Sequence, residues 1–130
     1  MYYWDYGCGH CKYVTPKLSA AYKKYGLQEL GVTLFTVNIN GDATEWKEKL
    51  STYGLDVEGA INTEDIYRRS GGTKLYDVIS TPRIYLIDSE GKLKAKQIGV
   101  PQLLKILSIE EGFEVDEADM EEIKFDETDE

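Results

Sequence analysis

The sequence predicts an α/β domain with a four-stranded mixed sheet and helices on both faces, in the order β-α-β-α-β-β-α. Three observations predict it. An aromatic, strand-forming run at residues 2–6 leads directly into a helical pattern over residues 9–25. Residues 32–39 form a nearly continuous apolar run, which is typical of a strand covered on both faces. Residues 83–88 and 93–98 are two further strands joined by a tight turn.

The first helix has one apolar face and a proline inside it. The apolar face recurs at the 3.6-residue helical spacing. Its residues are Val14, Leu18, Ala21, Tyr22 and Tyr25. Pro16 falls inside this pattern, and because proline has no backbone N–H to donate, we expect the helix to kink there.

The middle of the chain predicts a second helix followed by an insertion. Asp42 can cap a helix that ends at Gly54. We interpret residues 55–80 as a connecting insertion that packs on the edge of the sheet, with a dedicated binding element as the alternative. Asn62-Thr63 can cap a short helix that runs to Arg69. A last helix begins with Pro101 at its first position.

Length and charge divide the chain into a domain of residues 1–109 and an acidic tail of residues 110–130. Of the 24 acids and 15 bases, the tail holds twelve acids and one base, so its net charge is −11 and the rest of the chain carries +2. The tail is interpreted as solvated and disordered, or alternatively as docked through its apolar residues on the domain or a partner. Neither part offers a basic stripe for nucleic acid.

The chain opens directly on its first strand. No signal peptide precedes it, and no apolar run approaches the length of a membrane span. Because the start is abrupt, we expect that elements upstream of the domain are missing and that the sequence is a fragment, or has a misassigned start, of a longer protein.

The only two cysteines in the sequence form the motif Cys8-Gly9-His10-Cys11, at the turn from the first strand to the first helix. Free N–H groups and the positive end of the helix dipole favour a thiolate there, so we expect the pKa of Cys8 to lie below its free value of about 8.5. A protonated His10 favours it further. The Cys8 thiolate can attack a disulfide, and Cys11, one turn on, can then release the mixed disulfide.

Two other interpretations of the cysteine pair were weighed. A zinc site needs four ligands, and His10 is the only histidine in the chain, so no metal is expected. A structural disulfide across so short a loop removes little entropy from the unfolded chain. Redox chemistry is therefore the preferred interpretation, with no cofactor beyond the Cys8–Cys11 disulfide itself.

The sequence resembles the thioredoxin-like thiol–disulfide oxidoreductases over residues 1 to about 109. The resemblance rests on Trp4, the cysteine motif, Lys12 and Pro16, together with Thr81-Pro82 and the strand and hairpin that follow them. It is closest to the TlpA/ResA-like branch of bacterial envelope thioredoxins, whereas Cys-Gly-His-Cys is the motif of protein disulfide isomerases. The resemblance implies a thioredoxin fold and a more oxidising pair than Cys-Gly-Pro-Cys.

The resemblance also implies roles for residues around the pair. Pro82 would be cis and lie beside the cysteines, and the Thr81 backbone would pair with an extended substrate segment; from sequence alone, a trans proline that starts an edge strand is the alternative. Trp4 would pack behind the active site or simply in the core. Gly9 lets the backbone stay close at the turn.

Three departures from the family leave the proton acceptor for Cys11 open. Gly7 replaces a tryptophan, Tyr2 stands where thioredoxin has a buried acid, and Val14 stands where ResA-type proteins have a glutamate. The remaining candidate acceptors, which the sequence does not rank, are Glu58, Asp77 and Asp88.

The expected function is thiol–disulfide exchange on protein disulfides, with Cys8 as nucleophile and Cys11 as resolving thiol. Expected partners are protein thiols and disulfides and a redox protein that donates or accepts electrons, and a monomer is expected. A bacterial periplasm or cell envelope is implied by resemblance. The alternatives are a redox-inert thioredoxin-like adaptor and, ranked last, a peroxiredoxin relative.

Overall fold

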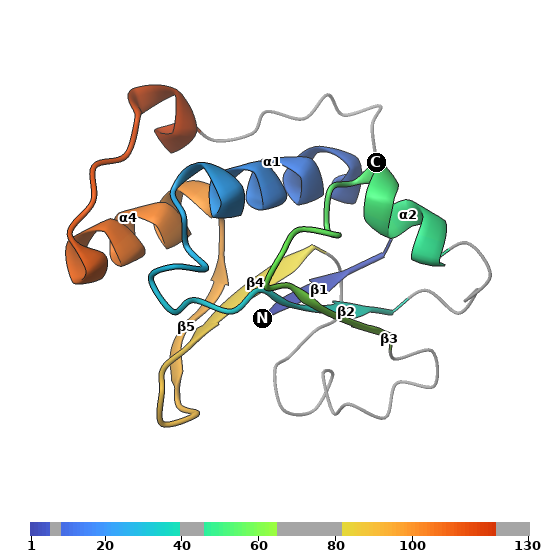
Figure 1. The fold of residues 1–130 in the computed structure, drawn as a ribbon, viewed down its shortest axis with the longest axis horizontal. Helices are drawn as coiled ribbons and strands as arrows, with labels where there is room; N and C mark the ends of the chain where they lie inside the picture. Colours follow the sequence, from blue (N-terminus) through green and yellow to red (C-terminus); the bar gives the residue numbers. More distant parts are fainter. Residues whose placement is uncertain (6–8, 40–45, 65–81, 122–130) are drawn as a thin grey trace.

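The computed structural model describes residues 1–5, 9–39, 46–64 and 82–121. These residues form a five-stranded sheet with the strand order β3-β2-β1-β4-β5. The strands are β1 (Tyr2–Trp4), β2 (Phe35–Asn38), β3 (Ile61–Glu64), β4 (Arg83–Ile87) and β5 (Leu93–Ile98), and the helices are α1 (Cys11–Lys24), α2 (Trp46–Thr52), α4 (Val100–Glu111) and the short 3₁₀ helix η1 (Glu117–Met120). Figure 1 shows β1 in the middle of the sheet, beneath α1.

The sheet is mixed, as the sequence predicts. β1 runs parallel to β2 and antiparallel to β4, β2 runs parallel to β3, and β4 pairs antiparallel with β5. The first residue belongs to this network as well, since the Met1 amino group donates to the Tyr85 carbonyl at 2.7 Å and the Tyr85 N–H donates to the Met1 carbonyl at 2.8 Å. Met1 therefore extends the pairing of β1 with β4 by one residue.

The predicted count of four strands is wrong, because residues 61–64 form the fifth strand instead of the start of a short helix. The polar side chains that suit a helix cap bond across to the sheet. Thr36 Oγ1 donates to Asn62 Oδ1 at 2.6 Å, and Thr63 Oγ1 donates to the Thr36 carbonyl at 2.8 Å. Asn62 Nδ2 also donates to the Leu55 carbonyl at 2.9 Å. The rest of the predicted helix, residues 65–69, lies outside the described residues.

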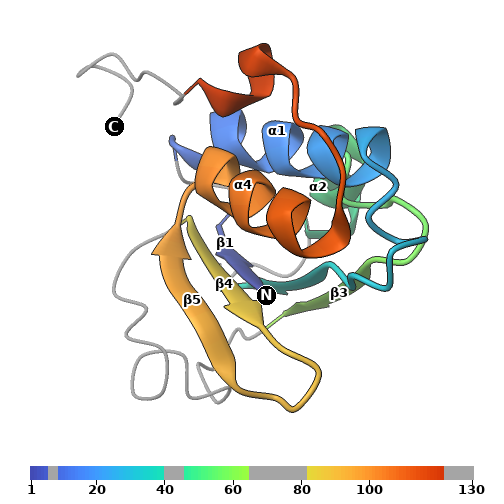
Figure 2. The same cartoon turned by 90° about the vertical axis from the view of Figure 1, so that its left-hand side faces the viewer.

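The three α-helices lie on one face of the sheet (Figure 2). The core beneath them combines the apolar face of α1 with that of α4. Fully or nearly fully buried members include Tyr2, Trp4, Leu18, Tyr22, Leu55, Ile84, Leu104 and Leu107. On the opposite face of the sheet, Tyr3, Val37 and Tyr85 form a second buried cluster. Helices over this second face, which the sequence also predicts, are not among the described elements.

A buried hydroxyl pair joins β1 to α1. The Tyr2 hydroxyl and Thr15 Oγ1 lie 2.6 Å apart, and both side chains are completely buried. Thr15 follows Cys11 by four residues, so the two side chains lie on the same face of α1. Ser19, four residues further on, is buried on the same face and donates to the Tyr53 carbonyl at 3.1 Å, so polar side chains recur within this contact.

The expected cap at Asp42 lies outside the described residues, and α2 ends within two residues of Gly54. The last helix begins one residue before Pro101, which therefore takes its second position. Gly112 ends α4 in the left-handed conformation, with φ at 74°, a conformation in which a side chain is strained.

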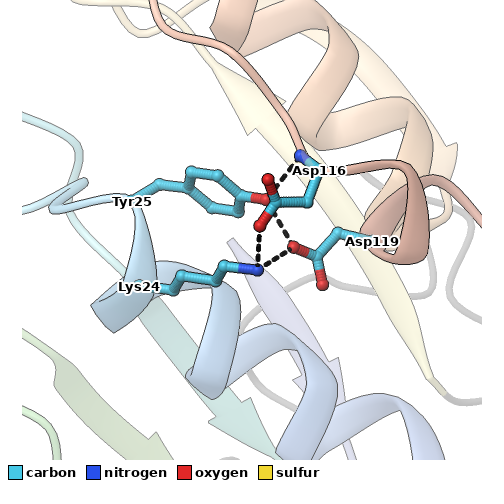
Figure 3. Close-up of polar contacts among 4 residues, drawn as sticks. All are labelled: Lys24, Tyr25, Asp116 and Asp119. Carbon is cyan, nitrogen blue, oxygen red and sulfur yellow. Dashed lines mark hydrogen bonds and ion pairs between the residues drawn. The ribbon is translucent and has the colours of Figure 1, made fainter.

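The segment after α4 turns back and docks along α1. Phe113 stacks on Tyr25 with ring centroids 5.4 Å apart, and Lys24 bridges Asp116 and Asp119 at 2.6 and 2.7 Å. The Tyr25 hydroxyl donates to Asp119 and accepts the Asp116 N–H, as Figure 3 shows. The expectation of a disordered tail is therefore wrong for residues 113–121. The alternative holds for Phe113 and Val115, which pack against the core.

Ion pairs and hydrogen bonds also join this docked segment to α1. Hydrogen bonds from Lys24 and Tyr25 keep the pKa of Asp119 below its usual range. Hydrogen bonds to Asp116 and Asp119 raise the pKa of Lys24. The pKa of Tyr25 is raised mainly by burial and secondly by its hydrogen bond to Asp119. We name this group (Lys24, Tyr25, Asp116 and Asp119) the tail anchor. It lies near the end of α1 that is remote from the cysteine motif.

Candidate redox site

The described part of the cysteine motif, Gly9 to Cys11, lies between β1 and the first turn of α1, where the sequence predicts it. β1 ends at Trp4, and Cys11 is the first residue of the helix. His10 is the N-cap residue, and its carbonyl accepts the N–H groups of Tyr13 and Val14 at 3.1 and 3.0 Å. Cys8 lies outside the described residues. The described half of the motif thus places one sulfur at the amino end of α1, with its free N–H groups and dipole.

The Cys11 side chain is completely buried and belongs to the same core cluster as Tyr2 and Trp4. A disulfide dissolved in solvent has no access to such a thiol. This burial fits the expected role of a resolving thiol better than that of a first nucleophile.

A pocket of about 540 Å³ brings His10 of the motif together with Pro82 from the start of β4. Its other walls come from α1 and from the junction between β5 and α4. The described lining residues are His10, Val14, Pro82, Arg83, Ile84, Gln97, Ile98, Gly99, Val100, Pro101 and Gln102. Thr81, which is expected to pair with the substrate, lies outside the described residues. The cis geometry of the Thr81–Pro82 bond, which the family resemblance implies, therefore stays a prediction.

The other predicted site residues that the structure describes do not line this pocket. Trp4 is completely buried and packs edge-on against Tyr53, with ring centroids 5.8 Å apart. Gly9 is half-buried directly before His10. Pro16 lies on the exposed side of α1, and the helix continues through it to Lys24.

None of the predicted proton acceptors that the structure describes lies at Cys11. Glu58 is exposed in the loop before β3. Asp88 follows the far end of β4, about 20 Å along the strand from Pro82. Its carboxylate accepts the N–H groups of Glu90 and Lys92, both at 2.9 Å, so it serves the hairpin turn. Asp77 lies outside the described residues.

Sequence reasoning missed the wall formed by residues 97–102. Gly99 indicates in the sequence where the strand ends, but the residue type of Gln97 does not indicate that it lines a pocket with the motif. Its backbone has a positive φ of 55°, which glutamine adopts only when the surrounding structure requires it. The sequence carries no signal for such a conformation.

Comparison with known proteins identifies the family. The family model described as thioredoxin-like matches residues 1–93. The chain belongs to the thioredoxin-like family. A search of curated proteins finds no match.

Solved structures similar to this thioredoxin-like chain come from several bacteria. A domain of a possible thiol-disulfide isomerase from Cytophaga hutchinsonii is 29% identical, with a TM-score of 0.71, over 85% of this chain and 73% of that one. The thioredoxin domain of a thiol-disulfide oxidoreductase from Bacteroides vulgatus is 22% identical, with a TM-score of 0.68, over 83% and 74%. A thioredoxin-like protein from Parabacteroides distasonis is 18% identical, with a TM-score of 0.65, over 82% and 76%.

These findings confirm the predicted thioredoxin-like fold and family. The TlpA/ResA-like branch stays a prediction, as does the redox role of the Cys-Gly-His-Cys motif. Among the described residues, no three histidine, cysteine or acidic side chains gather to hold a metal ion. No helix in the described ranges is long and apolar enough to cross a membrane.

Proposed function

We propose that this thioredoxin-like domain exchanges disulfides with protein substrates through Cys8 and Cys11. The Cys8 thiolate attacks a substrate disulfide, forming a bond between its sulfur and one substrate sulfur while the other leaves as a thiolate. Cys11 loses its proton and attacks the Cys8 sulfur. The Cys8–Cys11 bond forms, the second substrate thiolate leaves, and two electrons have passed to the substrate. The reverse sequence oxidises a dithiol.

The pocket shared by His10 and Pro82 is the observation that carries this proposal. These residues are far apart in the sequence, and the fold brings them to one opening directly beside the start of α1. An isolated Cys-x-x-Cys pair would need no such opening. A pocket of about 540 Å³ beside His10 provides space for a substrate segment next to the motif.

The burial of Cys11 supports the division of roles. A resolving thiol that external disulfides cannot reach acts only after the mixed disulfide has formed, which suppresses competing reactions at the second sulfur. The proposed centre needs no metal or organic cofactor, since the two sulfurs carry the electrons. A separate redox protein resets the pair, and the domain acts as a monomer, in the bacterial periplasm or cell envelope if the family resemblance extends to location.

Trapping experiments test the roles of the two cysteines. We expect Cys11→Ser to accumulate mixed disulfides that run through Cys8, because the resolving step is lost. The matched control, Cys8→Ser, should trap nothing, because Cys11 is buried. Non-reducing gels and mass spectrometry of the linked peptides identify the cysteine involved. Mixed disulfides on Cys11 in the Cys8→Ser variant would overturn the assignment.

The reduction potential of the pair separates an exchange enzyme from a redox-inert adaptor. Catalytic pairs lie above about −300 mV, whereas inert structural disulfides lie below it. Equilibration with glutathione or dithiothreitol buffers measures the value. A potential well below that limit would favour the adaptor and contradict the proposed exchange.

A further inference from the structure

Gln97 has an unusual backbone conformation. Among the described residues, it is the single non-glycine residue with a positive φ, at 55°. A side-chain-bearing residue is disfavoured in this region because its Cβ crowds the backbone. Residues held in this way are found at functional sites more often than elsewhere, when the surrounding structure enforces them.

A bulge in β5 accounts for this conformation. Ile98 pairs with Ile84, but Tyr85 pairs with Lys96, so Gln97 is an extra residue on β5. An extra residue bends its strand and changes the direction of its own side chain. The bulge lies at the end of β5 next to α4.

The bulge places Gln97 at the pocket that also contains His10 and Pro82. Its side chain is exposed. A second glutamine of this wall, Gln102, lies against the start of α4, because its Oε1 is 2.5 Å from the point where a Cβ on Gly99 would be. Both glutamines are exposed at this wall, and Gln97 is the one that lies at the bulge.

We propose that Gln97 binds the main chain of an extended peptide segment that carries the substrate's cysteine. This inference rests on the proposed exchange function and names the substrate feature that the pocket recognises. A carboxamide carries both a donor and an acceptor, so it matches the C=O and N–H of a peptide group. Recognition of main-chain groups is independent of side-chain sequence, which suits a domain that acts on many disulfides. Gln97 is a substrate-binding residue and takes no part in the transfer of electrons.

Two substrates distinguish this role from a general effect on activity. A cystine-bridged peptide offers peptide groups to Gln97, whereas cystamine is a small disulfide without any. We expect Gln97→Gly to lower kcat/KM for the peptide about tenfold, mainly through KM, because two neutral hydrogen bonds are lost. The rate with cystamine should stay within about twofold. Glycine accepts the positive φ at this position, so the bulge is retained.

Lys96→Gly is the matched control, since it places the same residue type one position earlier on β5, outside the pocket lining. It should leave both rates within about twofold. An unchanged peptide rate in Gln97→Gly, or an equal loss on both substrates, would overturn the role of Gln97. Failure of the exchange function itself has a different signature: the Cys8→Ser variant would then retain activity on both substrates.

Discussion

The buried hydroxyl pair between Tyr2 and Thr15 offers a sharp test of the packing behind Cys11. The two oxygens lie 2.6 Å apart and neither side chain is exposed. Removing one hydroxyl takes a buried partner from the other, at a cost of about 1–3 kcal/mol. We expect Thr15→Val to lie near the upper end of this range, because the change conserves shape and leaves a buried phenol behind. Tyr2→Phe should cost less, since a helical threonine can bond the carbonyl four residues earlier.

The double variant decides whether the pair acts as a unit. Replacing both partners by apolar groups of the same shape is nearly neutral. We therefore expect Tyr2→Phe/Thr15→Val to cost about 1 kcal/mol or less, well below the sum of the single costs. Urea unfolding followed by circular dichroism measures all four proteins, and the m-value should not change. For a chain of this size each kcal/mol moves Tm by about 3–5 °C. Single costs that simply add would refute the reasoning.

Three further results are expected. Burial lowers the pKa of the Met1 amino group to about 6, against about 8 when unfolded. The unfolded chain then binds more protons between these values, so stability should rise from pH 6 to pH 8; urea midpoints that stay flat in the wild type would contradict this. Asp119 has a lowered pKa. The contribution of Asp119 to docking should be present above about pH 4 and be lost as the pH falls through the pKa of Asp119 in the folded protein. Hydrogen exchange in residues 113–121 should then become faster. Asp119→Asn should remove this pH dependence. Gln97→Gly should raise the free energy of unfolding by about 0.5–1 kcal/mol, because strain at a positive φ is relieved; a lower Tm would argue against strain there.

The parts of the fold that the sequence predicts well are those in which local pattern and tertiary environment agree. The aromatic residues of β1 and the apolar face of α1 become core, and Leu18 and Tyr22 are buried as their spacing indicates. The hairpin between β4 and β5 forms around Gly91, whose φ is 81°. Local chemistry and packing point to the same structure in these elements.

The parts that it misses depend on distant partners. Asn62 and Thr63 suit a helix cap, but the open edge of β2 offers their backbones a ladder and their side chains two hydrogen bonds, both with Thr36. A third side-chain hydrogen bond joins Asn62 to the Leu55 carbonyl. The tail is acidic enough to predict disorder, yet Lys24 and Tyr25 supply the charge and the hydroxyl that hold it. The sequence of the tail does not indicate that Lys24 and Tyr25 are its partners.

The candidate site divides in the same way. The motif predicts His10 and Cys11 at the start of α1, because a strand and a helix flank it directly. Pro82 joins them through the pairing of β1 with β4, for which the family resemblance was the guide. Gln97 depends on the register between β4 and β5, and a register shift of one residue leaves no trace in composition or periodicity.

The position of Met1 has a practical consequence for anyone who handles this polypeptide. Its amino group donates to the Tyr85 carbonyl of β4, and Met1 lines a cavity of about 630 Å³ together with Phe35 and Leu86. An affinity tag or fluorophore coupled to this amine would remove the charged donor of that bond and extend the chain beside β4. A label that leaves the amine unmodified therefore preserves this contact.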